Sequence, residues 1–379
     1  MSISFLSFLI VLTIFWLVML TAANFVDLKK FGVYVSPLFI LLKIDKLGDL
    51  AFWIGERLEK PLKKAERTIT ALGLAIFIAL PISLIVNLFI SKAPILSAVP
   101  ITALTLENLL LFGTSLFIAL IVHEIAHATI AFAMGEEVET IGIGILGFFA
   151  VAFTQFPKAS FPSIPRRTKT IIIIGGILAN LLMVTFIIPI AVFSDQITAI
   201  GYEKRPGALV IAVYPLGPAE KANITSGTVI TGISTLFGQI RTNSEIITTY
   251  YDLINYLRQT PPESLIELTT NFGNFVLTTA QNKLFPNGST IGATVYHHYV
   301  GKITGAVSVT PFYFTLFVQW LLNVNLFLAF YNFLPVPFSD GQKLLDTIFP
   351  TLGKQRKRLI YAISAILLVA NLSQTVPPL

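Results

Sequence analysis

Long runs of apolar residues alternate along the chain with short segments that carry most of the charged side chains. A helix needs about 20 apolar residues to cross a hydrocarbon core about 30 Å thick, and helices satisfy their own backbone groups there. The pattern therefore predicts a polytopic α-helical membrane protein with about six transmembrane helices, at residues 1–23, 70–90, 109–134, 170–193, 312–333 and 359–370.

Two further apolar stretches, Val33–Leu42 and Leu50–Leu58, are too short to cross a membrane. We expect them to lie on the membrane surface as short or amphipathic pieces. Pro81 falls inside the second predicted span, where membrane helices tolerate a kink.

The segment from Val138 to Thr154 combines β-branched and aromatic residues with Gly142, Gly144 and Gly147. This composition is typical of strands joined by turns, so we expect a re-entrant β-hairpin. Non-helical backbone is tolerated at membrane depth only where protein or a water-filled cavity covers it. The hairpin is therefore expected beside such a cavity, and an ordinary hairpin on the cytosolic surface is the alternative.

From about residue 200 to residue 305 the composition becomes that of a soluble domain. Ser244–Leu257 places apolar residues at helical spacing behind a serine cap. The segment as a whole predicts an inserted α+β domain, with a helical turn at 218–222 and strands at 208–214, 228–233, 265–269, 275–279 and 290–295. The predicted domain boundaries are 1–108, 109–199, 200–305 and 306–379.

Charge indicates the orientation in the membrane. The net charge is +6, and the basic residues gather beside the apolar runs, which is typical of cytosolic loops and not of a nucleic-acid partner. With six spans, the clusters at 29–67, 158–169 and 354–358 are all cytosolic. Both termini and the inserted domain then lie outside the cell membrane. Because the chain has no cysteine, disulfides, thiolate ligands and cysteine nucleophiles are excluded.

The third predicted span carries the sequence His-Glu-Ile-Ala-His. His123, Glu124 and His127 are the only ionisable residues between positions 109 and 134. Residues four apart share one face of a helix, so both imidazoles can bind one metal ion with the glutamate beside them. A charged residue inside a membrane span is costly and usually functional. The motif therefore predicts a metal site within the membrane.

A catalytic zinc site usually has three protein ligands, so one ligand must come from elsewhere. Asp340 follows the fifth predicted span between Pro337 and Gly341, and we favour it over Asp346, which lies beyond a lysine. Asn180 is the only strongly polar residue of the fourth predicted span; it joins helices or takes part in catalysis. His297 and His298 are expected to be ordinary surface residues.

Three separated motifs resemble the site-2 protease family, the intramembrane zinc metalloproteases of peptidase family M50. They are His123-Glu-Ile-Ala-His127, Gly176-Ile-Leu-Ala-Asn180, and the segment from Asn332-Phe-Leu-Pro335 to Asp340-Gly341. Ala126 and Gln342 depart from the usual glycines of the family pattern.

The resemblance implies Zn²⁺ as the cofactor, with His123, His127 and Asp340 as its ligands and Glu124 as the catalytic glutamate. It also implies that Asn180 and Asn332 contact substrate backbone or stabilise an oxyanion. The insert resembles a single PDZ domain, with Gly207–Tyr214 as the strand that would pair with a C-terminal peptide.

The leading hypothesis is an endopeptidase that cuts transmembrane segments of single-pass membrane proteins, with its active site toward the cytosol. The main alternative is an inactive relative that binds membrane helices as a chaperone or adaptor, against which the intact Glu124 argues. A zinc peptidase with a glutamate as third ligand is disfavoured, because no glutamate follows Glu267. A transporter would leave the histidine spacing unexplained.

Overall fold

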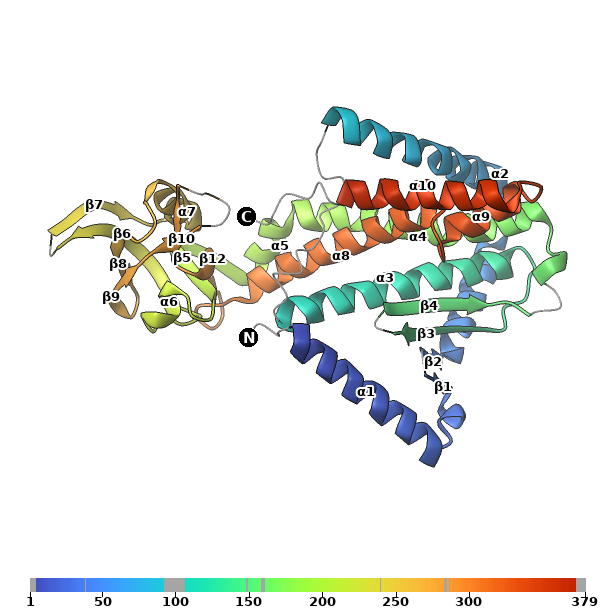
Figure 1. Ribbon diagram of the computed structural model, residues 1–379, viewed down its shortest axis with the longest axis horizontal. Helices are drawn as coiled ribbons and strands as arrows, with labels where there is room; N and C mark the ends of the chain where they lie inside the picture. Colours follow the sequence, from blue (N-terminus) through green and yellow to red (C-terminus); the bar gives the residue numbers. More distant parts are fainter. Residues whose placement is uncertain are drawn as a thin grey trace. The chain divides into compact units, whose positions relative to one another are not determined.

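The chain forms two compact units in the computed structural model. The helical unit comprises Ile3–Ile188 and Trp320–Val376, and the insert comprises Pro189–Gln319. The boundary falls inside helices α4 (Arg166–Val192) and α8 (Thr310–Phe333) (Figure 1). The structure describes residues 5–37, 39–91, 106–147, 149–157, 161–238, 240–282, 285 and 287–372.

Four helices in the described part of the chain are long and apolar enough to cross a membrane. They agree with four of the six predicted spans and cover Asp45–Ile90, Glu107–Ala133, Arg166–Val192 and Thr310–Phe333. Helices α1 (Phe5–Phe25) and α10 (Lys354–Leu372) occupy the positions of the first and last predicted spans. That these two also cross the membrane stays a prediction.

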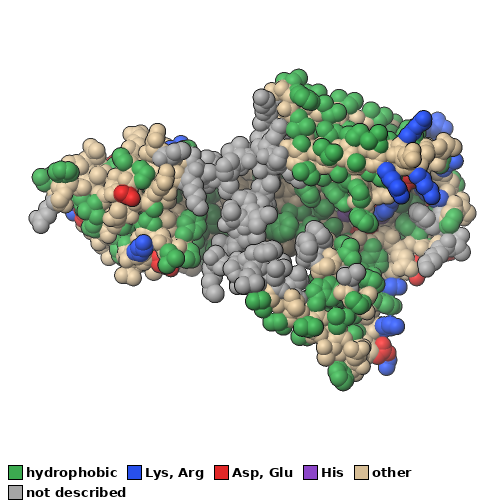
Figure 2. All heavy atoms as spheres, viewed as in Figure 1, with side chains coloured by type: hydrophobic (Ala, Val, Ile, Leu, Met, Phe, Trp, Pro, Cys, Tyr) green, Lys and Arg blue, Asp and Glu red, His purple; other side chains and the backbone are tan. Residues whose placement is uncertain are grey.

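The outer surface of the helical unit is apolar. Ile78, Ile82, Leu182 and Phe186 are each more than half exposed, and Figure 2 shows apolar atoms over much of the visible face, with Lys and Arg side chains gathered at one end. Apolar patches of this extent are rare on soluble monomers, whereas lipid would cover them. The surface therefore fits an integral membrane protein.

The second predicted span is part of a much longer helix, α2 (Asp45–Val86), which contains Pro61 and Pro81 and continues as a π-helix, Asn87–Ser91. Leu50–Leu58, which we predicted to be a short surface or amphipathic piece, is continuous with the second span in this one helix. Within it, Gly55 packs against α3 (Leu106–Ala133), where an added Cβ would lie only 2.9 Å from the Thr129 carbonyl oxygen. Close helix packing therefore holds this segment in α2.

The predicted hairpin is confirmed as strands β3 (Thr140–Leu146) and β4 (Phe149–Gln155). It is half of a larger sheet, because Val33–Leu42, which we predicted to be a short surface or amphipathic piece, forms a second hairpin, β1 (Val33–Ser36) and β2 (Phe39–Lys43). The sheet order is β1-β2-β3-β4, and all neighbours are antiparallel. Among the described strands, β2 therefore covers one edge of β3, and β4 keeps a free edge.

The insert is an antiparallel sheet with order β12-β5-β6-β8-β9, and β7 also pairs with β6. Its core contains Val210, Ile230, Ile266 and Leu268 of the sheet and Leu253 of helix α7. Its elements are α5 (Ser194–Gly201), β5 (Tyr202–Val213), α6 (Pro218–Lys221), β6 (Val229–Phe237), β7 (Ile240–Ile246), α7 (Tyr250–Gln259), β8 (Leu265–Thr270), β9 (Gly273–Thr278), β10 (Ala280–Gln281), β11 (Ser289–Thr290) and β12 (Ala293–Gly301).

Two predictions for the insert are wrong. The predicted helix 244–257 begins only at Tyr250, because Ser244 lies in β7 and Thr249 caps the helix in a reciprocal pair with Asp252. The predicted peptide-pairing strand, Gly207–Tyr214, lies mostly in β5, which is an interior strand between β12 and β6. An added peptide strand requires a free edge, so β5 cannot pair with one.

Candidate metal centre

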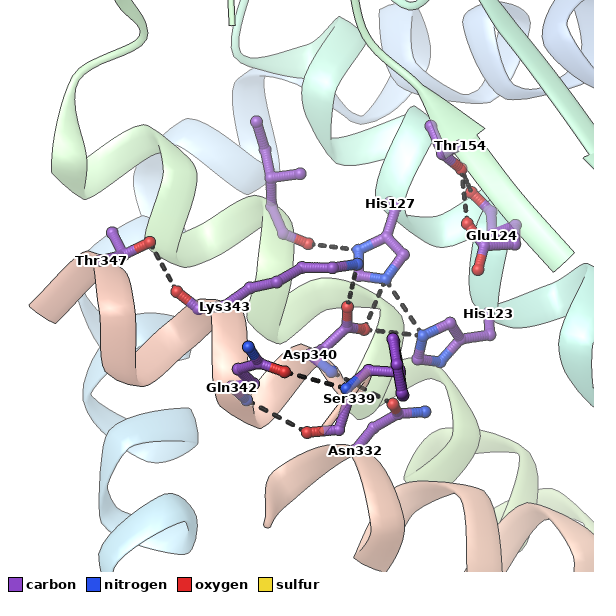
Figure 3. Close-up of polar contacts among 12 residues, drawn as sticks. His123, Glu124, His127, Thr154, Asn332, Ser339, Asp340, Gln342, Lys343 and Thr347 are labelled. Atoms are coloured by element: carbon purple, nitrogen blue, oxygen red, sulfur yellow. Dashed lines mark hydrogen bonds and ion pairs between the residues drawn. The ribbon is translucent and has the colours of Figure 1, made fainter. Parts of the chain in front are cut away.

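Helix α3 brings His123 and His127 to the same face, one turn apart. Both imidazoles are buried, with 4% and 6% exposure, and their Nε2 atoms lie 3.0 Å apart. Figure 3 shows the two rings converging, with Glu124 directed away from them. The helical spacing read from the sequence therefore produces the expected pair of adjacent imidazoles.

Asp340 completes the cluster from a distant part of the chain. Its Oδ2 lies 2.8 Å from the Nε2 atom of His123 and 2.8 Å from that of His127, and the residue is only 3% exposed. These three residues each offer one ligand atom within the distance that a single metal ion spans. The preference for Asp340 over Asp346 agrees with this geometry, because Asp346 instead contacts Lys357 and Tyr361.

Asp340 begins helix α9 (Asp340–Ile348), directly after the Ser339 cap. The Ser339 hydroxyl accepts a hydrogen bond from Gln342 N and donates to the Leu334 carbonyl, which ties the cap to the preceding loop. Gly341 is required there, because a Cβ would lie 2.3 Å from the Leu334 oxygen. Asn332 also accepts a hydrogen bond from the Asp340 backbone N–H at 3.3 Å. The loop thus fixes the aspartate.

Contacts of the two Nδ1 atoms orient the imidazole rings so that their Nε2 atoms point toward Asp340. His127 Nδ1 lies 2.7 Å from the Ile172 carbonyl oxygen, and His123 Nδ1 lies 2.6 Å from Asn180 Oδ1. Both partners are acceptors, so each Nδ1 carries the hydrogen and each Nε2 is left as a lone pair. Two lone pairs and a carboxylate oxygen then face one another. These residues therefore fit a bound cation, and nitrogen and oxygen ligands of this kind suit zinc.

Glycines of α4 allow α3 to approach closely enough for these contacts. A Cβ on Gly176 would lie 2.3 Å from His127 Nε2, and one on Gly175 would lie 2.1 Å from Ile130 Cδ1. Small residues are typical of close helix contacts in membranes. The Gly-Gly pair is therefore part of the site as well as of the helix packing.

Two side chains that the sequence did not single out contact the site. The Thr154 hydroxyl of β4 lies 2.8 Å from Glu124 Oε2 and 3.0 Å from the Glu124 carbonyl oxygen. Lys343 Nζ donates to Asp340 Oδ1 at 2.8 Å. Neither contact has a local signal in the sequence.

The other predicted site residues also lie near the centre. Asn180 is fully buried, and both ends of its carboxamide are engaged within the protein, by His123 on one side and by Ala119 O and Asn325 Oδ1 on the other. Asn332 contacts the Asp340 backbone. Contact of either asparagine with substrate stays a prediction.

The prediction that His297 lies on the surface is wrong. Only 9% of the residue is exposed, because Tyr250 and Tyr251 of α7 pack their rings against its imidazole. His297 and His298 lie in β12, and neither belongs to a group of three or more potential metal ligands among the described residues.

Comparison of the sequence with known proteins identifies the family to which the chain belongs. The model of peptidase family M50 matches residues 111–371, which is more than half of the chain and includes His123, His127 and Asp340. The chain is also 25% identical over 375 residues to the uncharacterized protein MJ0971 of Methanocaldococcus jannaschii, covering 95% of this chain and 90% of the relative. The family match confirms the resemblance drawn from the three motifs. The chain therefore belongs to peptidase family M50.

Proposed function

We propose that this protein is an intramembrane zinc endopeptidase of the site-2 protease type, which hydrolyses peptide bonds within transmembrane segments of single-pass membrane proteins. One observation carries the proposal. Three buried ligand atoms, from His123, His127 and Asp340, converge within a unit built from apolar helices, and Glu124 stands beside them without joining the cluster. The family, whose members are membrane metalloproteases, supports the same reaction class.

In this proposal His123 Nε2, His127 Nε2 and Asp340 Oδ2 hold the zinc ion. Bound zinc supplies a Lewis acid that lowers the pKa of water and polarises a carbonyl group. The protein's part is to keep both imidazoles neutral and oriented, which the Nδ1 contacts with Ile172 O and Asn180 Oδ1 do. Lys343 engages the second oxygen of Asp340, so this carboxylate presents a single oxygen to the cluster.

Glu124 acts as the general base and acid. Its neighbour His123 binds the metal, while its own carboxylate accepts a hydrogen bond from Thr154. A carboxylate that lies at the centre without being a ligand is free to accept the proton of the attacking water and then deliver it to the leaving amine. The H-E-x-x-H spacing on α3 supports this division of roles.

The free edge of β4 is the proposed site where the substrate chain is held. A transmembrane helix must unwind before cleavage, because its carbonyls are engaged in helical hydrogen bonds. An extended segment can then satisfy its backbone groups by pairing with an exposed strand. Thr154 of β4 touches Glu124, which would place such a segment next to the catalytic carboxylate.

We also propose that the insert lies outside the cytosol as a PDZ-like domain that contacts or screens substrates. It joins the helical unit through α4 and α8, both of which are candidate spans. The basic residues 166, 167 and 169 mark the opposite end of α4, and basic ends favour the cytosol. Peptide binding by the insert would require an edge strand other than β5.

The test is co-expression of the full chain with single-pass membrane proteins, comparing wild type with Glu124→Gln. We expect wild type to bind one zinc ion and to release a cytosolic fragment, and the variant to bind zinc without cleaving. Cleavage by Glu124→Gln with zinc retained would contradict the proposed role of Glu124. Stable association of wild type with membrane helices, without cleavage in the presence of zinc, would instead favour the adaptor hypothesis.

A further inference from the structure

A chain of carboxamide contacts lies behind His123 and links three helices. Asn325 of α8 donates through Nδ2 to the carbonyl of Leu321 at 2.8 Å. Asn180 of α4 donates through Nδ2 to Asn325 Oδ1 at 3.1 Å, and its Oδ1 lies 2.6 Å from His123 Nδ1 on α3. Both asparagines have no exposed surface. Their polar groups therefore contact only protein atoms and not solvent.

Backbone carbonyls determine the direction of every contact in this chain. The Leu321 oxygen only accepts, so the NH₂ group of Asn325 must face it and the Asn325 oxygen must face Asn180. That oxygen and the Ala119 carbonyl, 3.3 Å away, both accept, so Asn180 must direct its NH₂ group toward them. The Asn180 oxygen then faces His123, whose Nδ1 must carry the hydrogen. The hydrogen-bond partners therefore determine the orientation of both carboxamide groups.

We infer that Asn325 is a positioning residue for the metal centre, acting on His123 through Asn180. The inference rests on the proposed metal site. Without the Asn325 oxygen, one of the two acceptors that orient Asn180 is lost, and a flipped Asn180 would present NH₂ to His123. The imidazole would then carry its hydrogen on Nε2, where the metal must bind. Residues that orient metal-binding histidines typically contribute 10–100-fold to metal affinity.

His127 is oriented by a backbone contact and not by a side chain. Its Nδ1 contacts a backbone oxygen, that of Ile172, which side-chain replacement does not remove. Asn325 therefore controls one of the two histidines, and removing it should weaken the site without abolishing it. That expectation separates a positioning residue from a ligand such as Asp340.

The test compares the zinc affinity of the full-length protein in detergent, measured by chelator competition, for wild type and three variants. Asn325→Leu removes the acceptor, and we expect the zinc dissociation constant to rise about 10–100-fold. Asn325→Asp restores the contacts, because a neutral buried carboxyl group can donate to Leu321 O and accept from Asn180; its affinity should stay within about threefold of wild type. Asn323→Leu, a matched change on the same helix, should also stay within about threefold.

Wild-type affinity in Asn325→Leu, or equal losses in Asn325→Leu and Asn325→Asp, would overturn the inference. A second measurement needs no variant to fold. The chain has four histidines, so ¹⁵N-histidine NMR of the zinc-free wild type can report which ring nitrogen of His123 carries the hydrogen before a metal ion is bound. Hydrogen on Nδ1 supports the contact chain, and hydrogen on Nε2 overturns it. Failure of wild type to bind zinc would instead contradict the proposed function. The chelator-competition measurement on wild type reports this outcome directly.

Discussion

The four histidines of this chain form two pairs, and the two pairs have opposite surroundings. His123 and His127 are four residues apart on α3, so one face of the helix carries both, and their Nε2 atoms meet at Asp340. His297 and His298 are adjacent on β12, at a point where its pairing with β5 shifts register, from Ala208 to Arg205. His297 Nε2 accepts a hydrogen bond from Lys204 at 3.0 Å, and His298 Nδ1 donates to the Pro206 carbonyl.

The difference shows what makes a histidine pair a metal site. Spacing and secondary structure determine whether the ring nitrogens of two histidines can bind the same ion. The charged side chain beside the pair then determines whether that position favours a cation. A carboxylate faces the α3 pair and favours a cation, whereas an ammonium group faces His297 and opposes one. Each of the following predictions changes one of these conditions.

The largest effect is expected from Gly176→Ala. The new Cβ would lie 2.3 Å from His127 Nε2, so the imidazole could not keep its place and the α3 pair would lose its convergence. We expect zinc binding and proteolysis to fall below detection, as measured by metal analysis and substrate cleavage. Gly113→Ala on α3 is the control, because its Cβ would meet nothing within 4 Å. Zinc binding by Gly176→Ala would show that the packing of α4 does not determine the site.

Asp340→Asn should have the next largest effect, because it keeps the shape of the side chain and removes its charge. The α3 pair would then resemble the β12 pair, whose ring nitrogens contact Lys204 Nζ and Pro206 O and no carboxylate. We expect zinc affinity to fall more than 100-fold, beyond the loss typical of residues that only orient ligands. Asp346→Asn is the matched control, because its carboxylate contacts Lys357 and Tyr361. Equal losses in the two variants would remove Asp340 from the proposed ligand set.

The sequence predicted the parts of the site that depend on local geometry. Helical spacing placed His123 and His127 together, and the segment around Gly341 favoured Asp340 over Asp346, which agrees with the distances from Asp340 to both imidazoles. It also predicted the four long apolar helices, because a membrane span is a local property of composition. The glycine-punctuated strands β3 and β4 were likewise recognisable from their own residues.

The remaining features depend on partners distant in the sequence. Val33–Leu42 forms strands because β2 pairs with β3, about one hundred residues later, and a short apolar stretch alone does not distinguish a strand from a surface helix. Helix α7 starts at Tyr250 because Thr249 and Asp252 cap each other, which outweighs the serine signal at position 244. Asn325 and Thr154 gain their roles only from contacts made by folding.

His297→Gln tests the second pair. Burial, and next the Lys204 ammonium, lower the pKa of His297 to about 4, below the value of about 6.5 expected in the unfolded chain. The unfolded state therefore binds the proton first as pH falls, and the insert should lose stability between pH 6.5 and 4. We expect about 2 kcal/mol to be lost from pH 7 to pH 5.

Hydrogen exchange of residues 202–301 in the full-length protein, corrected for the intrinsic pH dependence of exchange, measures this effect. The His297→Gln variant should lose most of the pH dependence, because glutamine does not titrate in this range. Zinc affinity should not change in the variant, since His297 lies outside the proposed ligand set. An unchanged pH profile would show that protonation of His297 does not limit the stability of the insert.

The smallest effect is expected from Thr154→Val, which tests whether the α3 pair needs a held carboxylate beside it. Valine has nearly the shape of threonine but lacks the hydroxyl that donates to Glu124 Oε2 at 2.8 Å. A hydrogen bond to a charged group contributes about 1.5–3 kcal/mol, part of which water can replace, so we expect kcat to fall about tenfold. Zinc affinity should be unchanged, because Thr154 contacts Glu124 and not the ligands. Thr154→Ser keeps the hydroxyl and should retain most of the rate. If kcat falls equally in both variants, the strand side chain matters for packing, and orientation of Glu124 must come from the helix itself.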